Sequence, residues 1–236
     1  MVNLAGEGIA DKRWTRARKE AIRRSRIAAT RTLVRAISGC ATPPRVFISG
    51  SAIGYYGSHG DEAVIESTPP GSDFLARVCV DWEQEARALN TASTRIAIVR
   101  TGLAVGKDGG ALARMLLPFK LGLGGTVGSG EQYMPWIHVD DWCAMVMWLI
   151  ENDRASGAFN ATAPEPVTNR AFTRTLARVL GRPAIFRVPA FVLQLALGEM
   201  SSMLLTGQRV LPAFAEQHGF VFSYRTLEPA LRSLHL

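Results

Sequence analysis

The sequence predicts an α/β fold built on a parallel sheet. Apolar, β-favouring runs at Val46–Ile48 and Thr94–Val99 alternate with amphipathic helical patterns over Thr15–Ile37 and Ser72–Leu89. The chain also opens on Val2–Leu4, which has the pattern of the end of a strand. An order of strand, helix, strand, helix, strand is typical of parallel sheets with right-handed crossovers.

Composition limits the class of protein. With 236 residues, 47% of them hydrophobic, the chain can bury a sizeable core. The three cysteines are scattered and the four histidines form no metal-ligand motif, so we expect free thiols and no metal site. The longest apolar run is far shorter than the roughly 20 residues of a membrane span, and no signal peptide is recognisable. We therefore expect a soluble cytoplasmic protein without a membrane partner.

The net charge of +7 is concentrated in one helix. Residues 1–35 hold ten basic and three acidic side chains, so the rest of the chain is neutral. In Thr15–Ile37 the basic residues occupy the positions outside an apolar stripe, as on a solvated helix face. Only Trp14 supplies an aromatic ring nearby, and this pattern does not favour a nucleic-acid partner.

Hydroxyl-bearing residues follow the Val46–Ile48 strand. Ser49, Ser51, Tyr55 and Tyr56 lie in the segment where an open α/β sheet places its ligands. Arg100–Gly102 leaves the next strand at the same edge, so it should face the same crevice. Each hydroxyl could instead serve only as a turn former, and that alternative stays open.

The middle of the chain is rich in glycine. Residues 121–142 contain no phosphate-loop pattern, so we expect a mobile loop that folds over the site, with side chains from Gln132–Trp136. Asp140 or Asp141 should cap a helix that runs to about Asn152. The pattern around His138 favours a hydrogen-bonded structural histidine over a catalytic base.

The character of the chain changes near residue 154. We expect residues 1–153 to form one part of the fold and residues 154–236 a subdomain that closes over it. The apolar segment Pro189–Leu205 should be helical. Its Met and Leu stripe should serve packing: Leu195, Met200, Met203 and Leu204.

These motifs, taken in order, resemble a known family. NLAG, SGSAIGYYG, RTG and WIHVDD follow one another as in the NAD-dependent epimerase/dehydratase group of extended short-chain dehydrogenases/reductases. The tail, with RPAIFRVP, LGE, GQRVLP and GFVFSY, is similar to the small C-terminal domain of the atypical "epimerase family protein" branch. The resemblance covers nearly all of the chain and implies a doubly wound Rossmann-type sheet with a small α+β C-terminal subdomain. It implies that residues 1–153 are a partial NAD(P)-binding domain and residues 154–236 its substrate-side subdomain.

The resemblance also implies a cofactor and its contacts. The cofactor would be NADP(H) in preference to NAD(H), with a small molecule as substrate. Ser51 would match the active-site serine of the family, and Arg100, Thr101 and Gly102 would border the nicotinamide. Further cofactor contacts would come from Leu4, Ala5, Gly6, Ser49, Gly50 and Arg77.

One departure from the family concerns the cofactor. Members begin with a strand and a glycine-rich turn whose helix holds the pyrophosphate, and that part is missing here. We therefore expect the chain to start inside the fourth strand of a truncated sheet. It should bind cofactor poorly and self-associate through an exposed sheet edge.

A second departure concerns the chemistry. No tyrosine has a lysine four residues later, and Phe74 stands where the family tyrosine would fall. Arg77 can donate to a ribose or phosphate but cannot shuttle protons at neutral pH. Tyr56 or Tyr55, with Ser51, is the expected acid/base group.

Three functions remain open at this point. The first is a divergent NAD(P)-dependent oxidoreductase or epimerase that acts on a small carbonyl or sugar-like substrate and is impaired because the glycine-rich turn is absent. The second is a non-catalytic dinucleotide-binding sensor or scaffold, which the absent Tyr-Lys pair favours. The third, a basic nucleic-acid module, depends on one helix.

Overall fold

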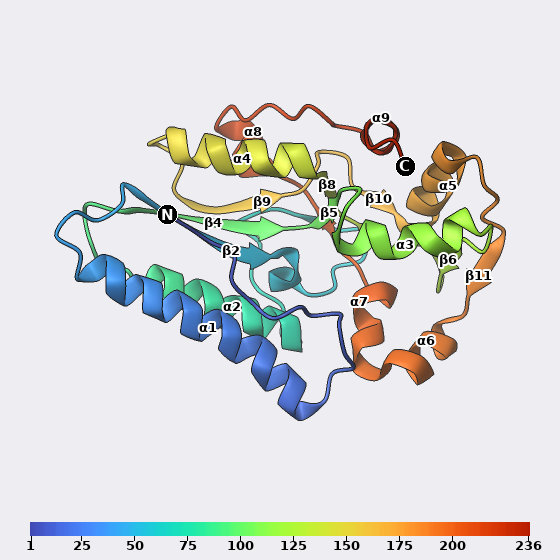
Figure 1. Cartoon of the computed structure of the whole chain (residues 1–236), viewed down its shortest axis with the longest axis horizontal. Coiled ribbons are helices and arrows are strands. Elements are labelled where there is room, and N and C mark those ends of the chain that lie inside the picture. Colours follow the sequence, from blue (N-terminus) through green and yellow to red (C-terminus); the bar gives the residue numbers. More distant parts are fainter.

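The computed structural model describes residues 1–236 and has a layered α/β architecture (Figure 1). Its main sheet has four strands in the order β1-β2-β4-β9, each parallel to its neighbours. They are β1 (Val2–Asn3), β2 (Val46–Ala52), β4 (Arg95–Thr101) and β9 (Gly157–Ala161). The predicted α/β class with a Rossmann-like parallel sheet is therefore confirmed.

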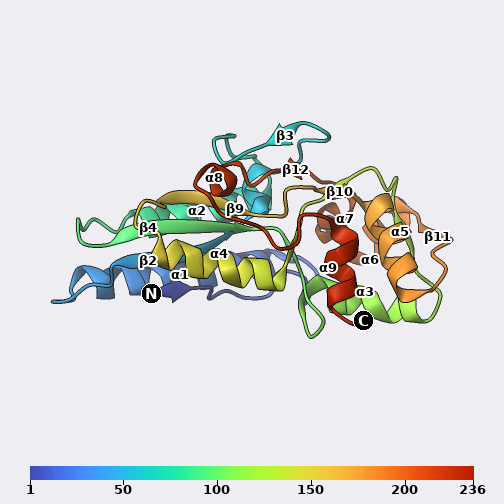
Figure 2. The same cartoon turned by 90° about the horizontal axis from the view of Figure 1, so that it is seen from above.

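Helices cover both faces of this sheet. Helices α1 (Arg16–Ser38) and α2 (Phe74–Arg87) lie together on one face, and α4 (Val139–Glu151) lies on the other (Figures 1 and 2). No helix is both long enough and apolar enough to pass through a lipid bilayer.

The side chains of β2 alternate between the two helical layers. Phe47 is fully buried and packs with Val34 of α1 and Ala86 of α2. Its neighbour Ile48 points the other way and packs with Met145 of α4. Successive side chains of a strand point to opposite faces, and here both faces are covered by helices. The sequence of the strand is therefore an almost continuous apolar run.

A second cluster lies beyond the carboxyl ends of the strands. Trp136 and Phe172 are fully buried there, together with Leu231 near the end of the chain. The elements outside the main sheet and its three helices are η1 (Ile53–Tyr56), β3 (Ala63–Val64), β5 (Leu103–Val105), α3 (Gly110–Lys120), β6 (Gly125–Val127), β7 (Tyr133–Met134), β8 (Trp136–His138), β10 (Val167–Thr168), α5 (Asn169–Leu180), β11 (Phe186–Val188), α6 (Ala190–Leu197), η2 (Gly198–Ser201), α7 (Ser202–Leu205), β12 (Arg209–Val210), α8 (Ala213–Gln217) and α9 (Leu227–Ser233).

The glycine-rich segment differs from its expectation. It forms three short strands rather than an irregular loop: β6 pairs with β11, β7 with β10 and β8 with β5. The start of α4 is also corrected, because Nδ1 of His138, and not Asp140 or Asp141, accepts the capping N–H of Asp140 at 3.1 Å.

The expected packing stripe of the C-terminal segment is buried only in part. Met200 is buried, but Leu195 is 80% exposed and Leu204 is 44% exposed. The segment is broken into α6, η2 and α7, with a turn at Gly198, so its apolar residues do not share one helical face. The prediction that all four residues serve packing was wrong for Leu195 and Leu204.

The two parts of the chain are interlocked. The expected boundary at residues 153/154 falls before β9, and β9 is the fourth strand of the main sheet. Ala215, Phe220 and Phe222, from the C-terminal part, are buried in the same cluster as Ile48 and Met145. The last third of the chain therefore completes both the sheet and the core beneath it.

Candidate functional site

The sheet brings the predicted residues of β2 and β4 together. Ser51 lies opposite Arg100, and Ala52 lies opposite Thr101. Asn3 lies opposite Ser49, so the segment after β1 leaves the sheet at the same edge. The expectation of a shared edge at the carboxyl ends of the strands is confirmed.

A buried ion pair lies directly behind this edge. Arg100 of β4 is 2% exposed, and Glu83 of α2 is fully buried. The Arg100 Nε and Nη2 atoms donate to the two carboxylate oxygens of Glu83 at 2.8 and 2.9 Å. Burial disfavours the guanidinium charge, but the Glu83 carboxylate outweighs it and the net pKa of Arg100 is raised.

The hydroxyl of Ser51 is attached to this pair. Ser51 is buried, and its Oγ donates to Oε1 of Glu83 at 2.8 Å. Its hydrogen is therefore held by a carboxylate, which leaves the oxygen lone pairs as the part of Ser51 able to accept from another group.

The hydroxyl of Tyr56 is bonded within the protein interior. Tyr56 is fully buried; its hydroxyl donates to Oδ1 of Asn160 at 2.7 Å and accepts from Nη1 of Arg100 at 2.8 Å. Burial raises the pKa of Tyr56 to about 12. A phenol with this pKa and two internal partners is poorly suited to exchange protons with a substrate.

Tyr55 is the more available of the two tyrosines. It is half-buried, and Cζ of Arg100 lies 3.6 Å from the centroid of its ring, in the geometry of a cation–π contact. The Tyr55 ring meets the Tyr56 ring edge-on at 5.3 Å. Its hydroxyl makes no hydrogen bond with the protein, so Tyr55 has an oriented ring and a free O–H group.

The network extends to the C-terminal part through Glu66. This carboxylate is 7% exposed, and its two oxygens accept from the backbone N–H of Asn160 at 3.0 Å and of Phe214 at 3.2 Å. Burial raises the pKa of Glu66. Nη1 of Arg100 also donates to the Glu66 carbonyl oxygen at 3.0 Å, so one hydrogen-bonded chain connects Ser51 with α8.

Leu4, Ala5 and Gly6 form an exposed loop after β1. Asn3 anchors the loop: its Nδ2 donates to Oγ1 of Thr30 at 2.9 Å, and its Oδ1 accepts from the Ala5 N–H at 3.2 Å. The loop therefore begins from a fixed residue and leaves its own backbone accessible at the sheet edge.

Two glycines and two hydroxyls at the strand ends have close neighbours. A Cβ atom on Gly50 would lie 3.0 Å from the Trp82 ring, and one on Gly102 would lie 2.6 Å from the Pro135 carbonyl oxygen. Both positions therefore need glycine for close approach. Ser49 is buried and donates to the Gly50 carbonyl at 3.3 Å, and Thr101 accepts from Trp142 Nε1 at 3.0 Å.

Arg77 is not brought into this cluster by any contact. It is exposed on α2 and forms no ion pair or hydrogen bond through its side chain. Phe74, three residues earlier, packs edge-on against Trp14, with ring centroids 5.1 Å apart. In this turn of α2, where the resemblance would place the family tyrosine, Phe74 thus packs against the N-terminal segment.

His138 has a structural environment. It is 2% exposed, its Nδ1 caps α4, and its ring lies against Tyr224 with centroids 4.1 Å apart. Burial lowers the pKa of His138, which favours the neutral ring that the cap requires.

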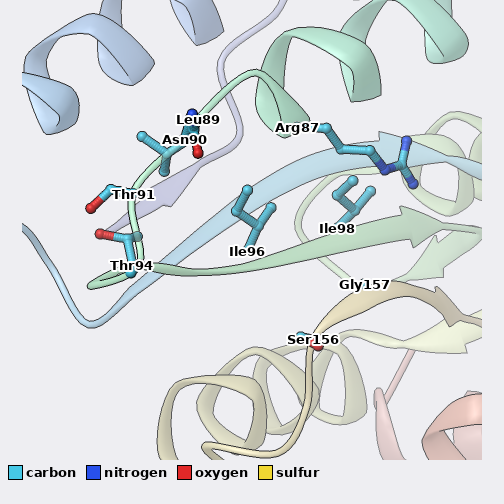
Figure 3. Close-up of a pocket in the computed structure, with 10 residues that line it drawn as sticks. Arg87, Leu89, Asn90, Thr91, Thr94, Ile96, Ile98, Ser156 and Gly157 are labelled. Carbon is cyan, nitrogen blue, oxygen red and sulfur yellow. The ribbon is translucent and has the colours of Figure 1, made fainter.

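A separate groove of about 470 Å³ lies toward the amino ends of β4 and β9 (Figure 3). Ile96 of β4 points into it, with Arg87 at the end of α2 and Gly157 at the start of β9 (Figure 3). None of the predicted site residues lines this groove. We therefore place the candidate site at the carboxyl edge, where the chemistry-bearing side chains are.

Sequence reasoning missed Glu83, Glu66 and Asn160. A signal existed for Glu83, which follows Trp82 within the otherwise apolar inner face of α2. A carboxylate in such a stripe indicates a buried partner, and Arg100 is that partner. Glu66 and Asn160 gave no local signal, because their partners come from distant segments.

Comparisons with known proteins agree with this arrangement. The family model of the NAD dependent epimerase/dehydratase family matches residues 1–162. A domain of unknown function (DUF1731) matches residues 188–234. The first match ends just beyond β9 and so contains the whole main sheet.

Curated relatives match along almost all of the chain. The "Epimerase family protein SDR39U1 homolog, chloroplastic" of Arabidopsis thaliana is 41% identical over 236 residues, covering 99% of this chain and 67% of that protein. The "Epimerase family protein YfhF" of Bacillus subtilis is 42% identical over 234 residues, covering 99% of this chain and 77% of that protein.

Solved structures give the same result. The human epimerase family protein SDR39U1 (isoform 2), crystallised with NADPH, superposes with a TM-score of 0.96 at 36% identity, covering 99% of this chain and 80% of that one. A nucleoside-diphosphate sugar epimerase from Corynebacterium glutamicum superposes with a TM-score of 0.79 at 32% identity, covering 99% of this chain and 45% of that one. The chain therefore belongs to the NAD dependent epimerase/dehydratase family, in its SDR39U1-like branch with a DUF1731 domain.

Proposed function

We propose that this chain is an NADP(H)-dependent oxidoreductase or epimerase that acts on a small carbonyl or sugar-like substrate. One observation carries the proposal: Ser51 and Tyr55 lie at the carboxyl edge of a parallel sheet, next to a buried Arg100–Glu83 pair. This edge is where proteins of this architecture bind dinucleotides. The NADPH in the human relative supports the choice of cofactor.

The residues at the edge fit a dinucleotide. The Leu4–Gly6 loop is exposed at the sheet edge, so a flat ligand could lie close to its backbone. In this proposal Leu4, Ala5, Gly6, Ser49 and Gly50 lie along the cofactor, and Arg100–Gly102 border its nicotinamide. When bound, the cofactor supplies the hydride donor or acceptor.

The two hydroxyls take different proton roles in this proposal. Tyr55 donates a hydrogen bond or a proton to the substrate oxygen, because its O–H group has no partner in the protein. Ser51 accepts from a substrate hydroxyl, since its own hydrogen is held by Glu83. Tyr56 holds Arg100 and Asn160 in place and does not touch the substrate.

The binding part of the proposal is tested by titrating the chain with NADPH and with NADH while following tryptophan fluorescence. We expect both to bind weakly, NADPH more tightly than NADH. A chain that binds neither cofactor would contradict the proposal, and tighter binding of NADH would contradict the NADP(H) preference.

The catalytic part is tested by three variants once a turned-over substrate is identified. We expect Tyr55→Phe and Ser51→Ala each to lower kcat by about 10²-fold or more, the usual range for a positioned acid or base. Tyr56→Phe serves as the comparison and should lower stability more than kcat. Unchanged kcat in Tyr55→Phe and Ser51→Ala would refute the assigned roles.

A non-catalytic dinucleotide-binding sensor or scaffold is the second candidate. Two observations favour it: the chain has no Tyr-x-x-x-Lys pair, and the Tyr56 hydroxyl is hydrogen-bonded to Asn160 and Arg100 within the protein. NADPH binding without hydride transfer to any member of a panel of carbonyl compounds and nucleoside-diphosphate sugars would favour this candidate. Consumption of NADPH that Tyr55→Phe abolishes would exclude it.

A further inference from the structure

Arg26 of α1 is a half-buried guanidinium without a carboxylate partner. Its Nη1 donates to the carbonyl oxygens of Glu7 and Ile22, both at 3.0 Å. The Glu7 carboxylate is paired with Arg18 instead, at 2.8 Å. The Nε and Nη2 groups of Arg26 have no hydrogen-bond acceptor in the protein, although each carries N–H hydrogens.

This guanidinium lies beside the loop that follows β1. A Cβ atom built on Gly6 would be 2.9 Å from Cζ of Arg26. Cζ also lies 5.2 Å from the centroid of the Trp82 ring, and that ring touches the backbone of β2 at Gly50. Arg26 therefore stands between the Leu4–Gly6 loop and the end of β2, on the α1–α2 side of the sheet.

The neighbouring thiol links Arg26 to Ser51. Cys79 of α2 is buried, and burial raises the pKa of its thiol to about 12. The Ser51 hydroxyl and the Arg26 charge both act on this thiol in the opposite direction. Arg26 and Ser51 therefore both act on the same buried thiol.

The free donors of Arg26 are not among the side-chain atoms sealed from solvent without a partner, so a ligand can reach them. Guanidinium groups match the oxygens of phosphates and of ribose hydroxyls through their fixed fork of donors. The chain has no Tyr-x-x-x-Lys pair, so it lacks the lysine that the family resemblance implies beside the ribose.

We propose that Arg26 binds the cofactor, donating from Nε and Nη2 to the ribose or phosphate oxygens of the nucleotide that passes the Leu4–Gly6 loop. It supplies the positive charge that the missing lysine would otherwise provide. Arg77, the arginine that the sequence suggested for this contact, lies exposed and without a partner. This inference rests on the proposed function, because it requires that NADPH binds at the carboxyl edge.

The test is the NADPH dissociation constant of three variants, measured by tryptophan fluorescence. Arg26→Gln should raise the constant about tenfold or more, the effect of losing a charge-assisted hydrogen bond. Arg24→Gln is the matched control: Arg24 is exposed on the same helix and has no side-chain partner, so its constant should change by less than about twofold. Arg26→Lys should give an intermediate value, because it keeps the charge but loses the fork.

Repeating the titrations in low and high salt separates the two kinds of acceptor. A defect in Arg26→Gln that shrinks in high salt indicates a phosphate contact, and one that persists indicates ribose hydroxyls. Thermal unfolding by circular dichroism reports whether the loop contact to Glu7 also matters for folding. If Arg26→Gln does not fold, the test uses Arg26→Lys instead. An NADPH dissociation constant of Arg26→Lys equal to that of the unchanged chain would then overturn the inference.

Two failures are distinguishable. An unchanged constant in a folded Arg26→Gln variant, with NADPH still bound by the unchanged chain, refutes the role of Arg26 and leaves the proposed function standing. Absence of NADPH binding in the unchanged chain refutes the proposed function and the role of Arg26 with it.

Discussion

Each charge buried at the candidate site has its partners within the protein. Glu83 accepts from Ser51, from Arg100 and, at 2.9 Å, from the half-exposed Arg87. Two charges in a low-dielectric interior are tolerated only when their hydrogen-bonding groups are satisfied in this way. The arrangement fixes the position of Ser51 and the Tyr55 ring with little freedom.

Removing Glu83 should destabilise the protein strongly. In Glu83→Ala, Arg100 would stay buried without its carboxylate, and we expect a loss of about 3–5 kcal/mol in the free energy of unfolding. Arg87→Ala, which removes the exposed partner of the same carboxylate, should cost no more than about 1 kcal/mol. Urea unfolding measures both losses in the free energy of unfolding. Equal losses would contradict the larger contribution of the buried Arg100–Glu83 pair.

The two adjacent tyrosines should respond differently to loss of the hydroxyl. Tyr56→Phe leaves Asn160 Oδ1 without its donor and Arg100 Nη1 without one acceptor, so we expect a loss of about 1–3 kcal/mol. Tyr55→Phe removes a hydroxyl without protein partners and should change stability by less than about 0.5 kcal/mol. The same denaturation experiment measures both, and a larger effect of Tyr55→Phe would contradict the hydrogen-bonding pattern.

At this scale the sequence predicted which residues come together better than how they bond. Ser51, Tyr55, Tyr56 and Arg100 lie near one another, because strand ends at one edge of a parallel sheet must meet. Which tyrosine is buried depends on the turn of η1 and on Asn160 from β9, and no local pattern carries that information. The pairing of Arg100 with Glu83 depends likewise on how α2 lies on the sheet.

Among the elements, those with a clear period of their own were predicted best. Helices α1 and α2 and strand β4 follow strong apolar patterns, and their boundaries agree closely with the prediction. Strand β2 was expected to end at Ile48 but runs to Ala52, so Ser49 and Ser51 lie within the strand and not in a loop after it. Strands β6, β7 and β8 have two or three residues each and exist through partners elsewhere in the chain. Short strands of this kind have no periodicity to read, so the sequence suggested a loop.

The start of α4 should make stability depend on pH. Burial lowers the pKa of His138 below its ordinary value of 6.5, so the unfolded chain binds this proton more readily than the folded one. The contribution of His138 is therefore complete above about pH 6.5 and is lost as the pH falls below it.

His138→Asn tests this directly. Asparagine keeps a capping oxygen for the Asp140 N–H but does not titrate. Urea unfolding of both proteins from about pH 8 to about pH 5 should show a steeper fall for the unchanged chain. Parallel curves would mean that His138 titrates alike in the folded and unfolded chains.

For the whole molecule, the C-terminal part is a structural component of the sheet domain. Ser223 and Tyr224 donate their backbone N–H groups to the Asp141 carboxylate at 2.8 and 2.9 Å, which holds the returning chain against the start of α4. Phe220 and Phe222 then enter the core cluster beneath β2, β4 and β9. The match of a separate family model to residues 188–234 does not mark an independent unit in this fold.

Deleting residues 211–236 should abolish cooperative folding. The deletion removes Ala215, Phe220 and Phe222 from the core, and burying each of the two phenylalanines contributes about 3–5 kcal/mol. We expect loss of near-ultraviolet circular dichroism and rapid proteolysis, while Phe222→Leu, a milder change at one of these positions, should still fold. A truncated chain with a sharp unfolding transition would contradict the interlocked core.

The contribution of Phe220 and Phe222 to the core also has a consequence for biosynthesis. Phe220 and Phe222 follow β2 and β4 in the chain, so they leave the ribosome after both strands. Until then part of the apolar face of the growing sheet stays uncovered, and such intermediates are prone to aggregate. Chaperones that shield newly made polypeptides would therefore matter most for this protein until Phe220 and Phe222 have emerged.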